Sequence, residues 1–428
     1  MITEHSLSVG QEALWFLYCM RPDDCAFNGA TPVLIPRRVD ADRLGRALRL
    51  VAERHSMLRS TFASRPAGPI RLVADDRVPP LDVRASADVT EAGIAAIVEE
   101  LAARPFDLEK DVPFRFTLTS TAAESVLVLT AHHIAMDVTA QMLLLRDLLQ
   151  EYAALSRGDR AELPAAADYD EFVADEQALL AGPRRTRAEA YWRELCLPLP
   201  PDLTLRPGRT GPAPTASATE RVSYGPEFSD RLDTAARSAG VTPFVYLFTI
   251  FQIQLYRETR QEDFLLGYTA STRLRPRSRN TVGYLVNTPP YRVRLDPDAT
   301  FTEVLAGCGR QLGSALPHLN YPFALLPGLL RAPRSRDRAP LVQVLFNFLP
   351  GKPFDLSVED APVTPLPGCS PPGGYDLIVE AVQRRTESIV SIQYKTHLFD
   401  AGPVRAMASG LGVLFDRFSR APESGILS

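Results

Sequence analysis

The 428-residue chain is long enough for two domains of ordinary size, each with its own hydrophobic core. Its composition, 45% hydrophobic and 23% charged, is that of a soluble globular protein, and a net charge of −4 without a basic block argues against nucleic acid as a partner. No apolar run approaches the roughly 20 residues that span a bilayer, and the first residues lack the features of a signal peptide, so we expect no membrane and a cytoplasmic location.

The first half of the chain mixes predicted helices and strands. Apolar spacing and capping residues such as Asp40 predict helices at 8–20, 40–55, 91–103, 139–155, 169–180 and 184–195. Strands are expected at 33–39, 58–62, 70–74, 113–120 and 126–131. This half should therefore pack helices around a sheet.

Proline and glycine then interrupt the pattern over about 198–218, which indicates an irregular connector. Beyond it we expect helices at 229–238, 243–256, 301–316 and 404–418, and strands or extended segments at 221–224, 264–271, 282–293, 341–348, 377–382 and 389–394. Both halves show the same mixture, which predicts an α/β fold of two similar lobes. We expect the N-terminal lobe at 1–182, a connecting helix and linker at 183–218, and the C-terminal lobe at 219–428.

The stretch from Ser125 to Tyr152 has the layout of a site on a rigid scaffold. An apolar run at 126–131 leads to two adjacent histidines, His132 and His133, and a helical apolar pattern begins soon after Asp137. Titratable side chains that a buried strand delivers to a loop are the usual arrangement of a catalytic site.

The adjacent histidines should have different roles. If both keep strand geometry, their side chains leave opposite faces, so they cannot both bind one metal or touch one substrate. We expect one ring to face a cavity and the other to be held in the structure. Asp137 is better placed as an ion-pair partner for the loop than as part of a proton relay. The alternative is a pair of core histidines at a strand end, without a catalytic role.

A metal centre is not expected. The other four histidines offer no cluster that could supply a third ligand: His5, His55, His318 and His397. The five cysteines are scattered and odd in number, which fits reduced thiols rather than a disulfide framework or a zinc site: Cys19, Cys25, Cys196, Cys308 and Cys369.

These features resemble the condensation domains of nonribosomal peptide synthetases, which share a fold class with chloramphenicol acetyltransferase. Residues 132–137 are similar to the His-His-x-x-x-Asp-Gly motif of that family. Seven further blocks resemble the family in the same order along the chain: Gln11 with Leu14–Leu17; Arg54-His55 with Leu58-Arg59 and Phe62; Tyr169, Asp170 and Phe172; 282–288; Pro322-Phe323; 340–347; and 394–400.

The resemblance implies a fold of two chloramphenicol acetyltransferase-like lobes, arranged as a V-shaped pseudo-dimer with a tunnel between them. It also implies a condensation-type acyltransferase. In that family a carrier protein presents the donor acyl group as a thioester on its phosphopantetheine arm. An amine or hydroxyl, usually held by a second carrier protein, attacks it to form an amide or an ester. No permanently bound cofactor is implied, and we expect a monomer.

The resemblance also suggests roles for individual residues. His133 matches the second motif histidine and is expected to be catalytic, because a neutral imidazole can take the proton of an attacking amine, whose pKa is near ~8. His132 should be structural. Asp137 is expected to pair with Arg273, which lies in a segment similar to the Gly-x-x-x-Ser-Gly-Arg segment that the family's other lobe supplies. The alternative for Arg273 is a solvated side chain in a basic run. Weaker candidates for the substrate channel are Tyr284, Asn287, Thr288 and Gln343.

Two positions depart from the family pattern. Val138 replaces the motif glycine, and Ala140 replaces a serine. A β-branched residue restricts the backbone and narrows the channel on its acceptor side, where glycine would leave it open. Either the acceptor side is remodelled for an unusual nucleophile, or the domain has lost catalysis and serves as a recruitment platform. Because His133 and Asp137 are both present, we favour the enzyme.

Overall fold

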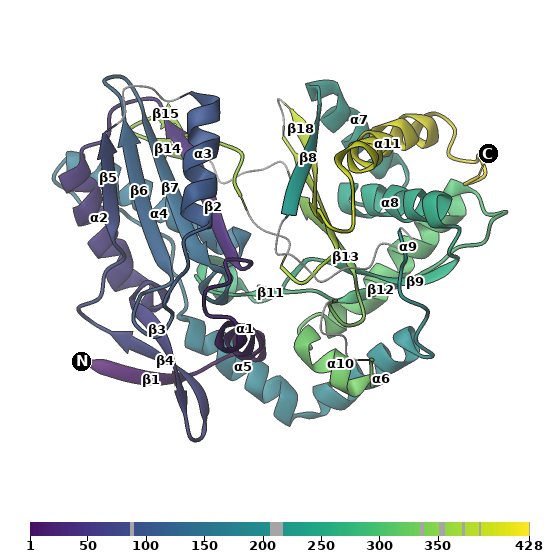
Figure 1. Ribbon diagram of the computed structural model, residues 1–428, viewed down its shortest axis with the longest axis horizontal. Coiled ribbons are helices and arrows are strands. Elements are labelled where there is room, and N and C mark those ends of the chain that lie inside the picture. Colours follow the sequence, from purple (N-terminus) through teal and green to yellow (C-terminus); the bar gives the residue numbers. More distant parts are fainter. Residues whose placement is uncertain are drawn as a thin grey trace. The chain divides into compact units, whose positions relative to one another are not determined.

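The chain forms two compact units (Figure 1). Unit 1 consists of Met1–Ala181, Ser271–Val286 and Phe354–Pro371, and unit 2 consists of Gly182–Ala270, Asn287–Pro353 and Pro372–Ser428. The computed structural model describes residues 1–85, 90–205, 217–333, 338–350, 356–369, 373–384 and 387–427. Residues 206–216 of the predicted connector therefore lie outside the described residues.

A five-stranded sheet forms the centre of unit 1. Its strands, in spatial order, are β16 (Thr364–Pro365), β2 (Asn28–Ile35), β7 (Ser125–His132), β6 (Phe114–Ser120) and β5 (Leu81–Ala85). A second sheet contains β1 (Ile2–Ser6), β4 (Gly68–Ala74) and β3 (Ser60–Arg65), and a short pair is formed by β14 (Ser357–Val358) and β15 (Ala361–Pro362). The helices are α1 (Val9–Met20), α2 (Ala41–Arg54), α3 (Glu91–Ala102), α4 (Val138–Ser156) and α5 (Tyr169–Ala181).

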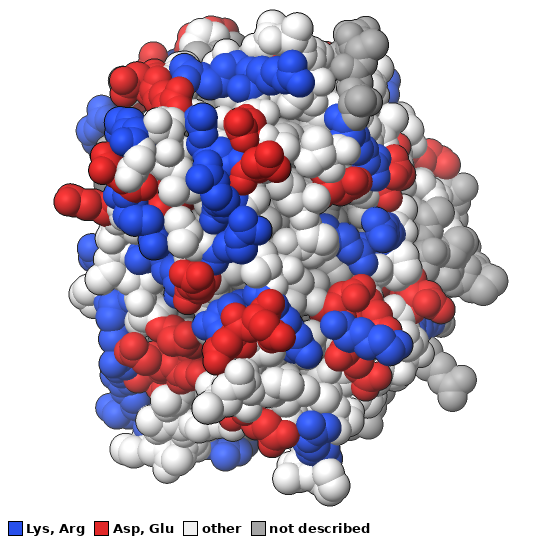
Figure 2. All heavy atoms as spheres, turned by 90° about the vertical axis from the view of Figure 1, so that its left-hand side faces the viewer, with Lys and Arg blue, Asp and Glu red and all other residues white. Residues whose placement is uncertain are grey.

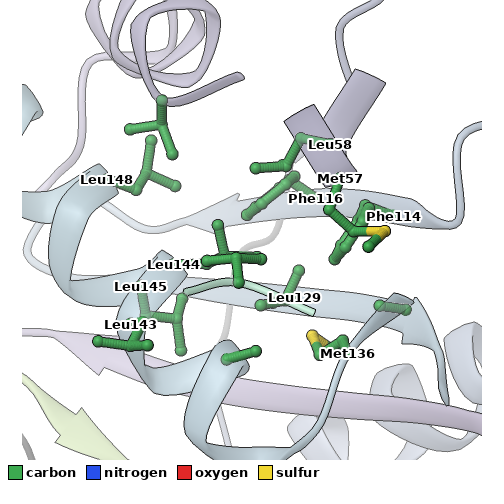
Figure 3. Packing of buried hydrophobic residues seen from close by; sticks show 14 of the residues in the cluster. Met57, Leu58, Phe114, Phe116, Leu129, Met136, Leu143, Leu144, Leu145 and Leu148 are labelled. Carbon is green, nitrogen blue, oxygen red and sulfur yellow. The ribbon is translucent and has the colours of Figure 1, made fainter. Parts of the chain in front are cut away.

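The central strand β7 is buried on both faces. Leu127 and Leu129 belong to the large apolar cluster that includes the leucines of α4, part of which is drawn in Figure 3. Val126 and Val128 belong to a second cluster, which contains Leu101 of α3. Successive side chains of a strand point to opposite faces, so a strand covered on both sides is apolar at most of its positions. This arrangement explains the continuous apolar run in the sequence.

Two segments from the second half of the sequence complete the core of unit 1. The segment 271–286 contributes Val282 and Leu285 to the large apolar cluster, and the segment 354–371 contributes Leu356, Val358 and Val363. In addition, β16 extends the central sheet by antiparallel pairing with β2. The chain changes from one unit to the other at the short strands β10 (Ala270–Ser271) and β11 (Val286–Asn287).

Unit 2 is built on a six-stranded sheet. In spatial order its strands are β12 (Pro290–Arg294), β9 (Asp263–Tyr268), β13 (Val344–Leu349), β17 (Leu377–Gln383), β18 (Ser388–Lys395) and β8 (Ser217–Tyr224). Its helices are α6 (Pro183–Cys196), α7 (Pro226–Ser238), α8 (Pro243–Thr259), α9 (Phe301–Ala315), α10 (Leu326–Leu329) and α11 (Ala401–Arg420). The rings of Phe248 and Phe251 from α8 pack against Phe346 of β13. The predicted α/β class is therefore confirmed.

In the described part of the chain, no single helix is both long and apolar enough to cross a bilayer. The helices α7 and α8 meet that test together, by length and composition, but they are bent by 94° at the break between them.

The predicted helices agree with the structure more closely than the predicted strands do. Most helix ends lie within three residues of the predicted positions. The strand predictions were incomplete: β1, β5 and the short strands β14, β15 and β16 were not predicted, and β2 begins at Asn28 rather than at Val33. The missed half of β2 is held by its pairing with β7, in which Asn28 lies opposite His132. Such a partner is distant in the sequence and leaves no local signal.

Charged side chains of both signs are spread over the surface of unit 1 on the side of α2 and β5. Figure 2 shows Lys and Arg side chains gathered in bands there, with Asp and Glu between them. One ion pair in this unit joins Arg84 to Glu100, whose side chains are 29% and 61% exposed. Exposed pairs of this kind contribute little to stability because water screens them.

Candidate active site

The histidine loop connects β7 to α4 in unit 1. β7 ends at His132, a 3-10 turn spans His133–Ala135, and α4 begins at Val138. Asp137 caps this helix, since its Oδ1 accepts a hydrogen bond from the backbone N–H of Ala140 at 2.8 Å. The predicted sequence of strand, loop and helix is confirmed.

His132 lies inside the protein and is only 3% exposed. Its Nδ1 accepts a hydrogen bond from the backbone N–H of Ile134 at 3.1 Å, so the proton of the neutral ring is on Nε2. Burial, and then the nearby charge of His133, lower the pKa of His132 to about 3. The ring is therefore neutral at physiological pH.

The ring of His133 has one fixed nitrogen. Its Nδ1 lies 2.5 Å from the carbonyl oxygen of Met136. A carbonyl oxygen can only accept, so Nδ1 must carry a proton, and in the neutral ring Nε2 then has a free lone pair. The ring of Tyr284 stands edge-on to that of His133, with 5.3 Å between the centroids. His133 is thus held in the tautomer that can accept a proton at Nε2.

The two histidines have different surroundings, but strand geometry does not cause the difference. His133 does not keep strand geometry, because the chain turns after His132 and the backbone N–H of His133 donates to the carbonyl of Phe27 at 2.8 Å. The turn moves the second ring away from the buried end of β7. His132 is buried, whereas His133 is partly exposed.

Asp137 and Arg273 form a buried ion pair within unit 1. Asp137 Oδ2 accepts hydrogen bonds from Arg273 Nη1 at 2.6 Å and from the backbone N–H of Leu285 at 3.0 Å. Both side chains of the pair are 6% exposed, which removes the alternative of a solvated Arg273. Because Oδ1 caps α4, both carboxylate oxygens are used to hold the loop. This geometry is that of an ion-pair partner and not of a relay to His133.

Further contacts fix the loop from its other side. Gln11 Nε2 donates to the carbonyl of Ile134 at 2.8 Å, and the Gln11 side chain is completely buried. The side chain of Met136 lies in the apolar cluster near Leu129 (Figure 3), which anchors the carbonyl that binds His133. The sequence matched Gln11 to a family block but did not predict this contact. Residues 11 and 134 are too far apart in the chain for any local pattern to reveal it.

The two departures from the family motif lie at the start of α4. Val138 is its first residue and is 42% exposed. Helical backbone is ordinary for a valine, so the position does not require glycine. Ala140 is completely buried in the apolar cluster of unit 1.

Three of the weaker candidates lie in unit 2. Asn287 Nδ2 donates to the carbonyls of Leu319 and Tyr321, each at 2.8 Å, and its Oδ1 accepts from the N–H of Phe323 at 2.9 Å. Asn287 therefore uses both polar atoms of its side-chain amide to hold the turn at 319–323. The Thr288 methyl group packs against Gly267, where an added Cβ would lie 3.0 Å from it.

Gln343 differs from Asn287, because half of its amide group is not bonded. The residue is only 2% exposed, and within the described ranges its Oε1 has no hydrogen-bond partner. Its Nε2 donates to the carbonyl of Ala339 at 3.5 Å.

Among the residues that the structure describes, no group of three His, Cys, Asp or Glu side chains is placed to hold a metal ion.

The predicted site residues are thus divided between the units. The histidine loop, the Asp137–Arg273 pair and Tyr284 come together in unit 1, and Asn287, Thr288 and Gln343 belong to unit 2. Tyr169 matches a family block in the sequence, but the sequence predicted no role for it. In the structure its hydroxyl donates to the carbonyl of Tyr284 at 3.0 Å.

The sequence of the chain is similar to a family of condensation domains and to peptide synthetases. The family model described as "Condensation domain" matches residues 1–427. The chain is 28% identical over 432 residues to a linear gramicidin synthase of Brevibacillus parabrevis, and the match covers 98% of this chain but 6% of that protein. It is 30% identical over 420 residues to phosphinothricin tripeptide synthetase PhsC of Streptomyces viridochromogenes, with 95% of this chain and 38% of that protein covered. The chain therefore spans a minor part of these relatives.

A solved structure shares the fold over almost the whole chain. The condensation domain from the monacolin K polyketide synthase MokA superposes with a TM-score of 0.89 at 20% identity, and 99% of each chain is covered. These matches confirm the family resemblance and the fold class that the sequence predicts.

Proposed function

Because the chain belongs to the condensation domain family, whose members are acyltransferases that form amide bonds in nonribosomal peptide synthesis, we propose that it transfers an acyl group between carrier-bound substrates. The donor is an acyl thioester on the phosphopantetheine arm of one carrier protein. The acceptor is an amine or a hydroxyl, presented by a second carrier protein. The product is an amide or an ester, and the domain works as a monomer without a permanently bound cofactor. We also place the protein in the cytoplasm, because five cysteines scattered along the chain, an odd number, fit reduced thiols in that compartment.

The observation that carries this proposal is the tautomer of His133. The carbonyl of Met136 holds the proton on Nδ1, which leaves Nε2 able to accept a proton from the acceptor group. A carbon–nitrogen or carbon–oxygen bond forms at the thioester carbon as that proton moves to Nε2. The carbon–sulfur bond then breaks, and His133 returns the proton to the leaving thiolate. The number of protons on the enzyme is the same before and after the reaction.

The residues around His133 have supporting roles in this proposal. His132 is a neutral, buried side chain that packs at the end of β7. Asp137 and Arg273 hold the loop and the start of α4 in place. These residues act on the position of His133 and take no part in the proton transfer. A catalytic side chain must be held in a fixed position to be efficient, and the contacts of Asp137 and Arg273 hold the loop that carries His133.

We assign the acceptor side of the site to the start of α4. Val138 is the exposed first residue of that helix, and a side chain at this position reduces the space for the nucleophile. Ala140 supports it from the apolar cluster. In unit 1, Tyr284 is a substrate-channel residue in this proposal. In unit 2 the proposed channel residues are Asn287, Thr288 and Gln343, and the unbonded oxygen of Gln343 is a hydrogen-bond acceptor for an N–H group of a substrate.

The direct test follows product formation by mass spectrometry, with donor and acceptor carrier proteins loaded with candidate substrates. The wild-type protein should release the donor from its carrier and form the coupled product. His133→Ala should reduce this transfer by about 10²-fold or more. His397→Ala is the matched control, because it removes an imidazole that lies outside the histidine loop, and it should retain normal transfer.

A recruitment platform would behave differently in the same assay. Wild-type protein would bind loaded carriers and give no product with any pair. In that case His133→Ala would not differ from wild type. Normal transfer by His133→Ala would remove His133 from the mechanism even if the wild-type protein is active.

A further inference from the structure

Two tyrosines, Tyr169 and Tyr284, link the first helix of unit 1 to the ring of His133. We propose that they are positioning residues that keep the His133 ring in the orientation in which Nδ1 donates to Met136. The inference rests on the proposed function, because it assigns a purpose to the orientation of that ring. Tyr169 acts on His133 only through Tyr284.

Tyr284 is enclosed between His133 and α1. Its ring lies at 89° to the ring of His133, with the centroids 5.3 Å apart. An edge-on arrangement of this kind is favourable for aromatic rings and depends on their relative orientation. On the side of α1, a Cβ added at Gly10 would lie only 2.6 Å from Cε1 of Tyr284. The absence of a side chain at Gly10 therefore leaves room for the tyrosine ring.

Tyr169 fixes the backbone that carries Tyr284. This residue begins α5, is 1% exposed, and its hydroxyl donates to the carbonyl oxygen of Tyr284 at 3.0 Å. The hydroxyl oxygen of Tyr169 lies 2.9 Å from Oγ of Ser8 and accepts the hydroxyl proton of that serine. The ring of Tyr169 covers Gly283, where an added Cβ would be 2.0 Å from Cδ2. Ring and hydroxyl thus hold two consecutive residues.

The first turn of α1 contacts this pair and the histidine loop at once. Ser8 caps the helix and contacts Tyr169, Gly10 adjoins Tyr284, and Gln11 donates to Ile134 in the turn that follows His132. A displacement of Tyr284 therefore removes the aromatic contact on one side of the His133 ring, and the ring can then turn away from the carbonyl of Met136. Small displacements of a catalytic group reduce the rate strongly, because proton transfer depends on distance and angle.

The test uses Tyr169→Phe, which keeps the buried ring and removes only the hydroxyl. The primary readout is the nitrogen NMR spectrum of histidine-labelled protein, in which His133 is assigned by the signals that disappear in His133→Ala. In the wild-type protein the signals should be those of a neutral ring protonated at Nδ1. In Tyr169→Phe they should shift toward the values of a ring that exchanges between tautomers, and kcat should fall about 10-fold while KM changes less than about 2-fold.

Tyr152→Phe is the matched control for the lost hydroxyl. Tyr152 is also a buried tyrosine of unit 1, and its hydroxyl accepts one hydrogen bond, from the N–H of Asp40 at 3.0 Å. This variant also loses one tyrosine hydroxyl and its hydrogen bond to a backbone group, elsewhere in the unit. The nitrogen signals of His133 and the value of kcat should stay at their wild-type values.

Gly10→Ala tests the same inference from the other side of Tyr284. Alanine normally stabilises a helix relative to glycine, but here its Cβ would collide with the tyrosine ring. We expect the His133 signals to shift in this variant as well. Gly45→Ala in α2 is its control, because the nearest atom to the added Cβ is 3.9 Å away, and it should leave those signals unchanged.

The outcomes separate this inference from the proposed function. Unchanged His133 nitrogen signals in both Tyr169→Phe and Gly10→Ala overturn the positioning role, whatever the activity of these variants. A shift in both, together with normal signals in the two controls, supports it. If the signals shift as expected but His133→Ala retains transfer, the tyrosines position the ring and the proposed catalytic role of His133 is wrong.

Discussion

The ion pair between Asp137 and Arg273 offers a sharp test of how unit 1 holds the histidine loop. Asp137 accepts three hydrogen bonds, from Ala140, Arg273 and Leu285. Asp137→Ala removes all of them at once. The backbone N–H of Leu285 and the guanidinium of Arg273 then remain buried without their acceptor, although Arg273 still donates to the carbonyl of Thr281 at 3.1 Å.

The expected magnitude follows from these contacts. Removing one partner of a buried ion pair costs about 3–5 kcal/mol, because the other charge stays in a poorly solvated place. Loss of the helix cap adds about 1 kcal/mol, so Asp137→Ala should lower the free energy of unfolding by about 4–6 kcal/mol. Arg273→Ala should cost less, about 3 kcal/mol, because Asp137 keeps two backbone donors. Asp137→Asn retains an oxygen that can cap α4, so its free energy of unfolding should lie between those of the wild-type protein and Asp137→Ala.

Urea unfolding can follow unit 1 separately, because the chain has two tryptophans, one in each unit. Trp15 is buried in unit 1 and Trp192 in unit 2. In a Trp192→Phe background the fluorescence therefore reports the unfolding of unit 1. The double variant Asp137→Ala/Arg273→Ala should be more stable than the sum of the single effects predicts, with a coupling energy of about 2 kcal/mol or more.

The exposed pair of Arg84 and Glu100 is the control for this measurement. Its side chains are 29% and 61% exposed, so Glu100→Ala should change the free energy of unfolding by less than about 1 kcal/mol. If Asp137→Ala lowers the free energy of unfolding no more than Glu100→Ala does, the ion pair does not hold the histidine loop. A coupling energy near zero in the double variant would also contradict this role of the pair, since the two residues would then act independently.

Three other predictions concern the site and its surroundings. Val138→Gly should widen the range of accepted nucleophiles and leave donor binding nearly unchanged; identical acceptor profiles of the variant and the wild-type protein in competition assays would contradict this. Burial raises the pKa of Glu176 from 4.5 to about 7, so its contribution to stability is fully present below pH 4.5 and is lost as the pH rises through 7. The wild-type protein should therefore lose about 3 kcal/mol relative to Glu176→Gln between these limits. Equal slopes of unfolding free energy against pH for the two proteins would show that this carboxyl does not titrate there. The loss of transfer in His133→Ala should not be reversed by raising the pH, since no other group replaces the imidazole; recovery of transfer at high pH would contradict this.

The elements and the family could be recognised from the sequence because their signals are local. The apolar run of β7, the two histidines and the amphipathic pattern of α4 lie within 28 consecutive positions, 125–152. Helices depend on contacts three and four residues apart, so their positions were predicted well. The motif residues His133 and Asp137 and the partner Arg273 were also found, because a family resemblance combines many short blocks.

The roles of these residues depended on contacts that no local pattern contains. The proton on Nδ1 of His133 follows from the carbonyl of Met136, whose place is set by the turn after β7. The hydrogen bonds of Tyr169 with Ser8 and Tyr284 join positions more than 110 residues apart. Arg273 is far from the histidine loop in the sequence, and only packing of 271–286 into the core of unit 1 brings its guanidinium to Asp137. Backbone propensity and hydrophobic period thus determined where helices and strands begin, whereas burial of apolar surface between distant segments decided which polar groups meet at the site.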